Sequence, residues 1–185
     1  DIIPINNYKL NCLRNNIGVI LQDVFLFADT IQNNVTLFDD DISKDQVVNA
    51  AKELGIHKFI MSLPDNYNFN VQERGNTLSS GQKQLIAFMR VLIKNPDILI
   101  LDEATSSIDS YSEDLIKSAT KKITKNKTSI IIAHRLSTIE SASRIIYMEG
   151  GLIQETGNHK ELIEKENGRY RKLHQEQFAN SEILN

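Results

Sequence analysis

Polar residues stand directly after three short apolar runs of this chain. Gln22 follows Gly-Val-Ile-Leu, Asp102 and Glu103 follow Ile-Leu-Ile-Leu, and His134 follows Ile-Ile-Ile-Ala. Taken singly, each has an ordinary structural explanation: a solvated glutamine, an acidic pair that caps a helix, or a hydrogen-bonded histidine. Together they fit one site for hydrolysis of a magnesium-bound nucleotide. An apolar strand that ends in Asp-Glu is the Walker B pattern, in which the first carboxylate holds Mg²⁺ and the second activates water.

A loop that could grip phosphate precedes these residues. Its sequence is Leu-Ser-Ser-Gly-Gln, residues 78–82, and an apolar helix is expected directly after it. Serine hydroxyls and the N–H groups at a helix start bind anions, although alone the pattern is better explained by an ordinary serine N-cap beside a glycine. The position of the loop between a polar turn and a buried helix, ahead of the Walker B pattern, favours the anion site. The 185 residues contain no Gly-rich loop ending in Lys-Ser or Lys-Thr, the usual cradle for nucleotide phosphates. The identity of the phosphate that the loop grips is therefore open at this point.

The elements that must position these residues alternate between strands and helices. Buried strands are expected at 17–21, 98–102 and 128–133, and the last two are continuous apolar runs typical of strands covered on both faces. Helices are predicted at 43–54, 57–63, 81–94, 110–123, 158–165 and 168–178, and a hairpin at 144–148 and 152–156. This order predicts an α/β fold with a parallel sheet, and residues 23–80 form a largely helical insertion. Ligands of such sheets collect at the carboxyl ends of the strands, where the polar residues stand.

The composition limits which partners and structural features are expected. A net charge of −3 and a pI near 5.8 provide no basic field for nucleic acid, which we do not expect as a partner. A single cysteine, Cys12, excludes an internal disulfide. No apolar run approaches the ~18 residues that span a bilayer.

Two long stretches carry a resemblance to a known family. The run LSSGQKQLIAFMRVLIKNPDILILDEATSSID, followed by IIAHRLSTI, resembles the nucleotide-binding domain of ATP-binding cassette (ABC) transporters. The resemblance extends from NCLRNNIGVILQDVFLFADTIQNNV to GLIQETGNHKELIEKENGRYRKL, almost the whole chain. It implies a P-loop NTPase fold of the ABC type: a RecA-like core at 1–22 and 91–157, a helical subdomain with the signature at 23–90, and C-terminal helices at 158–185.

The resemblance also implies roles for single residues. Gln22 matches the Q-loop glutamine, which contacts Mg²⁺ and water, and Asp102 matches the Walker B aspartate that binds the metal. Glu103 matches the catalytic glutamate, and His134 matches the switch histidine. The nucleotide-binding signature, usually LSGGQ, is matched by Leu78, Ser79, Ser80, Gly81 and Gln82, and the D-loop by residues 106–109, which end at Asp109. ATP and Mg²⁺ are the implied cofactors.

Partners and location follow from the same resemblance. Residues 71–75, Val-Gln-Glu-Arg-Gly, look like the exporter-type segment that contacts the transmembrane domains. The chain thus resembles a bacterial multidrug or lipid exporter half-transporter, paired head to tail with an identical or related nucleotide-binding domain. Transmembrane domains outside these residues, expected N-terminal in the same polypeptide, would hold it at the cytoplasmic face of the membrane and couple ATP hydrolysis to efflux.

Two departures from the family pattern matter. Ser80 replaces the first signature glycine, which adds a hydroxyl where backbone approaches phosphate. The family also places an aromatic base-stacking residue and the Walker A loop before the Q-loop, and this chain starts after both. We therefore expect a fragment that is inactive alone. The alternatives are a non-transporting ABC ATPase of repair or translation, or a catalytically dead interaction unit.

Overall fold

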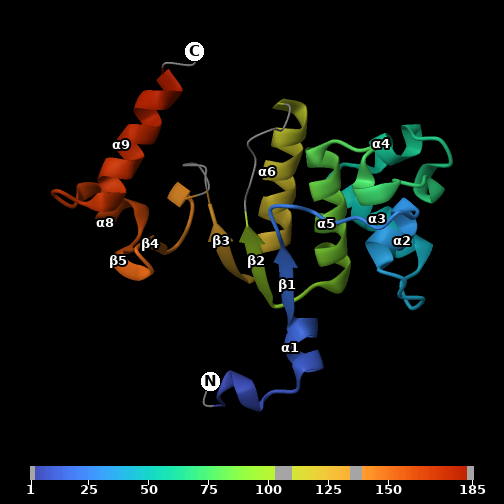
Figure 1. Ribbon diagram of the computed structural model, residues 1–185, viewed down its shortest axis with the longest axis horizontal. Coiled ribbons are helices and arrows are strands. Elements are labelled where there is room, and N and C mark those ends of the chain that lie inside the picture. Colours follow the sequence, from blue (N-terminus) through green and yellow to red (C-terminus); the bar gives the residue numbers. More distant parts are fainter. Residues whose placement is uncertain (1–2, 103–109, 134–138, 183–185) are drawn as a thin grey trace. The chain divides into compact units, whose positions relative to one another are not determined.

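The computed structural model describes residues 3–102, 110–133 and 139–182 (Figure 1). The chain divides into two compact units, Asp1–Ile132 and Ala133–Asn185. The first unit holds the sheet and the helical insertion, and the second holds a hairpin and two helices. The predicted division into core, helical subdomain and C-terminal helices stays a prediction.

The first unit is a mixed α/β structure. Its strands are β1 (Ile17–Ile20), β2 (Ile98–Asp102) and β3 (Thr128–Ile132). Its α-helices are α1 (Leu10–Asn16), α2 (Ile31–Thr36), α3 (Lys44–Leu54), α4 (His57–Ser62), α5 (Ser80–Lys94) and α6 (Ser110–Thr124). Short 3₁₀ turns cover Ile5–Asn7, Asn66–Asn68 and Glu73–Gly75. The three strands form one parallel sheet in the order β1-β2-β3, which confirms the predicted fold class.

Helix α5 lies in the core of this unit because apolar residues cover most of its surface. Seven of its residues are buried, including Leu85, Phe88 and Met89. The helix ends at Asn95, which adopts a left-handed conformation before Pro96 blocks further helical turns. These residues belong to the large apolar core cluster of the unit, and the helix packs against α2, α3, α6 and β1.

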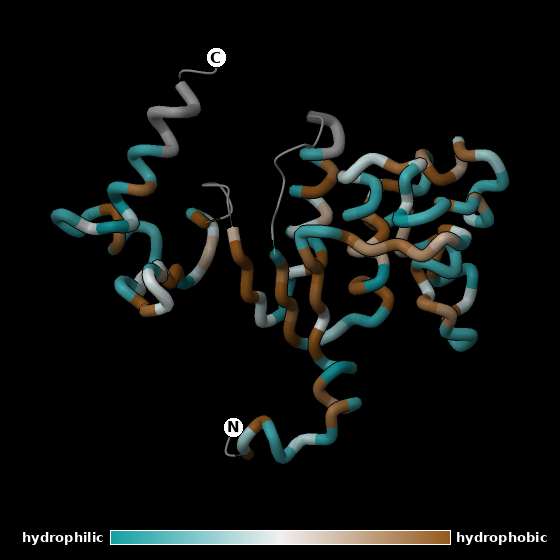
Figure 2. Tube along the Cα trace, viewed as in Figure 1, coloured by the Kyte–Doolittle hydropathy of each residue, from teal (hydrophilic) through white to brown (hydrophobic). Residues whose placement is uncertain are grey.

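The burial of β2 and β3 differs from the expectation of strands covered on both faces. In β2, buried Leu99 and Leu101 alternate with half-buried residues. In β3, Ile130 and Ile132 are 56% and 53% exposed. The expectation was wrong for β3. An apolar run indicates that both faces of a strand can be buried, but their actual burial depends on which helices or loops pack on each face. Figure 2 shows the strands as apolar segments.

The helical insertion begins and ends its helices at local signals that the sequence displays. In α3 the Ser43 hydroxyl accepts from the Gln46 N–H while the Gln46 side chain accepts from the Ser43 N–H, a capping box. Gly55 then ends the helix with φ of 82°. The helices of this insertion were expected from the sequence, whereas the antiparallel bridge between the distant residues Thr30 and Asn70 was not.

The second unit has its own small core. Strands β4 (Ile145–Glu149) and β5 (Leu152–Gly157) form the predicted antiparallel hairpin, followed by α8 (His159–Glu164) and α9 (Arg169–Glu182). Ile145, Leu162 and Tyr170 are its buried apolar residues in the described part of the chain. Across the described residues of both units, no helix combines the length and apolarity needed to cross a bilayer.

Candidate functional site

The parallel sheet brings two of the predicted strand-end residues, Gln22 and Asp102, to one edge. Ile20 of β1 lies opposite Leu101, so Gln22 and Asp102 both stand at carboxyl ends of adjacent strands. Gln22 is exposed two residues beyond β1, and Asp102 is the half-buried last residue of β2. The other predicted site residues, Glu103, Asp109 and His134, lie outside the described residues.

The predicted phosphate loop is a capped helix start. The Ser79 hydroxyl accepts from the Gln82 N–H at 3.3 Å, and the Gln82 Oε1 accepts from the Ser79 N–H at 3.0 Å. Leu78 and Gly81 are buried, whereas Ser80 is exposed at the first helical position. The capping box therefore fixes the loop shape with the side chains of Ser79 and Gln82, and it leaves Ser80 on the surface.

The direction of α5 places this helix start near the same end of the unit as the strand ends. Only residues 95–97 separate α5 from β2, and α5 packs against β1, so the helix runs antiparallel to the strands (Figure 1). Its C-terminus adjoins the start of β2, and its N-terminus points toward the carboxyl ends. The loop 78–82 and the residues Gln22 and Asp102 consequently belong to one end of the first unit.

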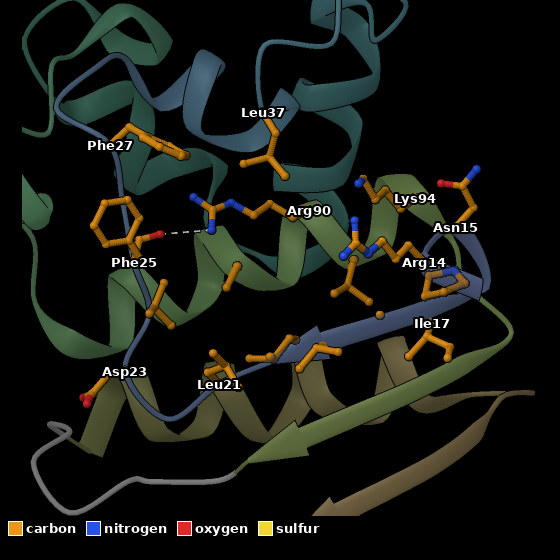
Figure 3. A pocket seen from close by; sticks show the side chains of 17 residues that line it. Arg14, Asn15, Ile17, Leu21, Asp23, Phe25, Phe27, Leu37, Arg90 and Lys94 are labelled. Atoms are coloured by element: carbon orange, nitrogen blue, oxygen red, sulfur yellow. Dashed lines mark hydrogen bonds between the residues drawn. The ribbon is translucent and has the colours of Figure 1, made fainter. Parts of the chain in front are cut away.

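The segment after Gln22 is held by a buried amide and an arginine. Asn34 of α2 is fully buried, and its side chain accepts from the Phe27 N–H at 2.8 Å and donates to the Phe27 carbonyl at 3.0 Å. Arg90 of α5 donates to the Asn34 carbonyl at 2.7 Å. It also donates to the Phe25 carbonyl at 3.1 Å (Figure 3). The chain after Gln22 is thus tied directly to the helix that begins at the phosphate loop.

Arg90 and Asn34 were missed in the sequence reasoning. Arg90 is the one charged residue inside the apolar run 85–93, and a cation in such a run needs acceptors when the helix is buried. That isolated charge was the available signal. Burial lowers the pKa of the Arg90 guanidinium from its ordinary value, and three hydrogen bonds to Phe25 and Asn34 satisfy it.

Residues 71–75, predicted to face transmembrane domains, pack on the same segment. The Val71 N–H donates to the Asp29 carbonyl at 3.0 Å, and Val71 itself is fully buried. Gly75 has φ of 65°, and an added Cβ would lie 2.8 Å from Leu26 Cδ1. Between these buried anchors, residues 72–74 are exposed. The turn therefore presents its polar residues on a backbone fixed against the chain that follows Gln22.

A cavity of about 300 Å³ lies between β1, the segment after it and α5 (Figure 3). Its lining is largely apolar, and it also includes the cations Arg14, Arg90 and Lys94 with one acid, Asp23. Neither Gln22, Asp102 nor the loop 78–82 lines it. The described residues of the predicted nucleotide site therefore lie outside this cavity.

Comparison with known proteins decides the family. The family model described as ABC transporter matches residues 2–106, more than half of the chain. This chain belongs to the ABC transporter family. It is 46% identical over its full length to the ABC transporter ATP-binding protein YknU of Bacillus subtilis, and 47% identical over 90% of its length to YgaD of the same organism, whose name describes multidrug export and an ATP-binding/permease protein.

A solved structure supports the same assignment for the ABC fold. A bacterial Atm1-family ABC exporter with ATP bound matches with a TM-score of 0.84 and 39% identity, over 94% of this chain. The ABC chain described here spans 32% of YknU, 29% of YgaD and 30% of that exporter chain. The predictions that this chain is an exporter-type ABC nucleotide-binding domain and that it has an α/β fold are confirmed.

Proposed function

We propose that this chain is the ATP-hydrolysing part of an ABC exporter that couples hydrolysis to efflux of a substrate across a membrane. The observation that carries the proposal is the placement of Asp102 and Gln22 at adjacent carboxyl ends of one parallel sheet. Ligands of such sheets bind at that edge. Relatives named as export ATP-binding/permease proteins supply the transport context.

The donors at this edge suit Mg²⁺. Asp102 offers a carboxylate and Gln22 an amide oxygen, the hard oxygen ligands that Mg²⁺ takes in nucleotide sites. When bound, Mg-ATP supplies the γ-phosphate that water attacks. In the proposed site, Glu103 polarises that water and His134 donates to the γ-phosphate, while Gln22 helps to orient the water.

The loop 78–82 acts on a nucleotide held by a second nucleotide-binding domain in a head-to-tail pair, and Asp109 is assigned to nucleotide binding with it. The capping box supports this role because it fixes the start of α5 before any ligand arrives. The exposed Ser80 adds a hydroxyl at the position where the usual signature has glycine. The second domain is either a copy of this chain or a related one.

A transmembrane partner docks on the exposed residues 72–74. These residues stand on the rigid turn described above, which is anchored to the segment after Gln22. Movement of that segment on nucleotide binding would therefore reach the partner directly. On this proposal the chain works at the cytoplasmic face of the membrane, held by transmembrane domains.

Replacement of Glu103 by glutamine in the intact exporter tests the catalytic assignment. The variant should bind ATP with unchanged affinity but hydrolyse it at least about 100-fold more slowly, because the general base is lost while the metal ligand Asp102 remains. ATP turnover and nucleotide binding are measured in parallel. Turnover at the parent rate would remove Glu103 from the catalytic role.

The 185-residue chain alone is expected to show negligible ATP hydrolysis, because its sequence holds no Gly-rich loop for the β- and γ-phosphates. Calorimetric titration with Mg-ATP should show weak binding. Micromolar affinity in this titration would contradict the proposal that the phosphate cradle comes from residues outside this sequence.

A further inference from the structure

A cluster of two histidines and one glutamate lies in the second unit. Glu140, His159 and His174 each offer one ligand atom, and these atoms all lie within 4.8 Å of one another. We call these three residues the His–Glu cluster. They come from three separate segments: the chain around Ile139, helix α8 and helix α9.

Contacts within the cluster are specific. His174 Nε2 and Glu140 Oε1 are 2.9 Å apart, and the rings of His159 and His174 have centroids 5.3 Å apart. Neither histidine is fully exposed, and the His174 side chain is only 13% exposed. Imidazole nitrogens and a carboxylate oxygen thus converge on one small volume.

A shell of other groups orients the cluster. His159 Nδ1 and the Tyr170 hydroxyl are 2.8 Å apart, so Nε2 is the nitrogen of His159 that can take a metal. Tyr170 is itself buried beside Leu162 and Ile145, and Ile139 packs against the same apolar residues.

We propose that the His–Glu cluster is a binding site for a divalent transition-metal ion, with Zn²⁺ as the best-suited ion. Two imidazoles and one carboxylate form a ligand set that suits zinc, with a fourth position left for water. The hydrogen bond between His159 and Tyr170 is the kind of contact that fixes the tautomer of a metal-bound histidine.

The geometry requires only side-chain movement. Ligand atoms about 2.0–2.1 Å from zinc in a tetrahedron are about 3.3 Å apart. The 2.9 Å pair of His174 and Glu140 would open slightly, and the longest separation in the cluster would shorten by up to about 1.5 Å. Changes of this size lie within the reach of χ rotations of exposed Glu140 and half-buried histidines.

Metal binding would join the three segments of a unit whose apolar core is small. Glu140, α8 and α9 would then share one ion in addition to their packing on Tyr170. Since a metal that binds only the folded unit stabilises it by mass action, the second unit should gain stability as zinc is added. The proposal does not depend on the nucleotide site.

The test is titration of the tag-free 185-residue chain with ZnCl₂ by calorimetry, with Co²⁺ absorption as a report of tetrahedral geometry. We expect a single zinc ion per chain at micromolar affinity or tighter. His174→Gln and Glu140→Gln should each weaken binding at least about tenfold. Glu140 is exposed, so Glu140→Gln keeps the test valid even where a histidine variant unfolds.

The matched control is His57→Gln in the first unit. His57 also has Nδ1 2.8 Å from a tyrosine hydroxyl, that of Tyr67, but among the described residues it belongs to no group of three converging metal ligands. This variant should bind zinc like the parent. Absence of saturable binding by the parent, parent-like binding by both ligand variants, or an equal loss in His57→Gln would each overturn the proposal.

Discussion

Each unit of this chain organises a turn around one buried polar side chain, and the two side chains differ in charge. Asn34 in the first unit binds Phe27 and Arg90 through a neutral amide. Glu155 in the second unit is 7% exposed, and its carboxylate accepts from the N–H groups of Arg169 and Tyr170 at 3.1 and 3.0 Å. Both side chains replace water as the partner of backbone groups that lie outside regular hydrogen-bond ladders.

This difference in charge determines how the hydrogen bonds of each side chain respond to pH. An amide has no proton to gain or lose, so the tie around Asn34 should be independent of pH. The backbone N–H of Tyr170, and then Lys165, lower the pKa of the Glu155 carboxyl from its ordinary value of 4.5, against the opposing effect of burial. Glu155 therefore stabilises the start of α9 only while it is ionised.

Asn34→Ala should have the largest effect. It removes the side-chain partner of the Phe27 N–H and carbonyl and one of the three acceptors of the Arg90 guanidinium, at a cost of about 3–4 kcal/mol in the free energy of unfolding. Asn33→Ala in the same helix removes one bond to Asp29 and should cost about 1 kcal/mol or less. Urea denaturation measures the loss of unfolding free energy in both variants. Equal losses would show that the Asn34 side chain contributes no more to stability than that of Asn33.

Glu155→Gln should cost about 2 kcal/mol at pH 7, because an amide accepts less strongly than a carboxylate from two N–H groups and loses the ion pair to Lys165. The folded pKa is lowered, so this stabilisation is complete above the ordinary value of 4.5 and disappears as pH falls through the lower folded value.

The measurement is hydrogen exchange at the start of α9 in parent and Glu155→Gln protein between pH 7 and 3, with intrinsic exchange rates corrected for pH. The gap in protection between these two proteins should narrow in the acid range. The loss of unfolding free energy in Asn34→Ala, measured by urea denaturation over the same pH range, should stay constant. Exposed Glu164→Gln is the control and should change protection little. A Glu155→Gln gap that widens in acid would reverse the assigned sign.

The smallest expected effects concern the two matched His–Tyr pairs. Tyr67→Phe and Tyr170→Phe each remove a hydroxyl that lies 2.8 Å from a histidine Nδ1, and each should cost about 1 kcal/mol without metal. Zinc affinity distinguishes the two variants. Tyr170→Phe should weaken it about tenfold because the partner that orients His159 is lost, and Tyr67→Phe should leave it unchanged. Equal zinc affinity in both variants would show that Tyr170 does not orient a ligand.

Much of the first unit was predictable because its signals are local. In this unit, the N-caps Ser43 and Ser79 and the end of α5 at Asn95 are all visible in short stretches of sequence. The hairpin turn at residues 150–151 of the second unit is visible in the same way. The parallel sheet followed from strands that alternate with helices. The burial of β3 did not follow, because Ile130 and Ile132 are apolar whether or not a layer covers them.

Sequence by itself determined the family, the order of the motifs and the elements that carry Gln22, Asp102 and the loop 78–82. Only the tertiary structure decided that Arg90 meets Asn34 across 56 positions and that Glu140 meets His174 across 34. The physical reason is the distance along the chain over which each interaction acts. Caps and apolar periodicity act within a few residues, whereas a buried cation or a converging ligand set finds its partners only after distant segments have packed.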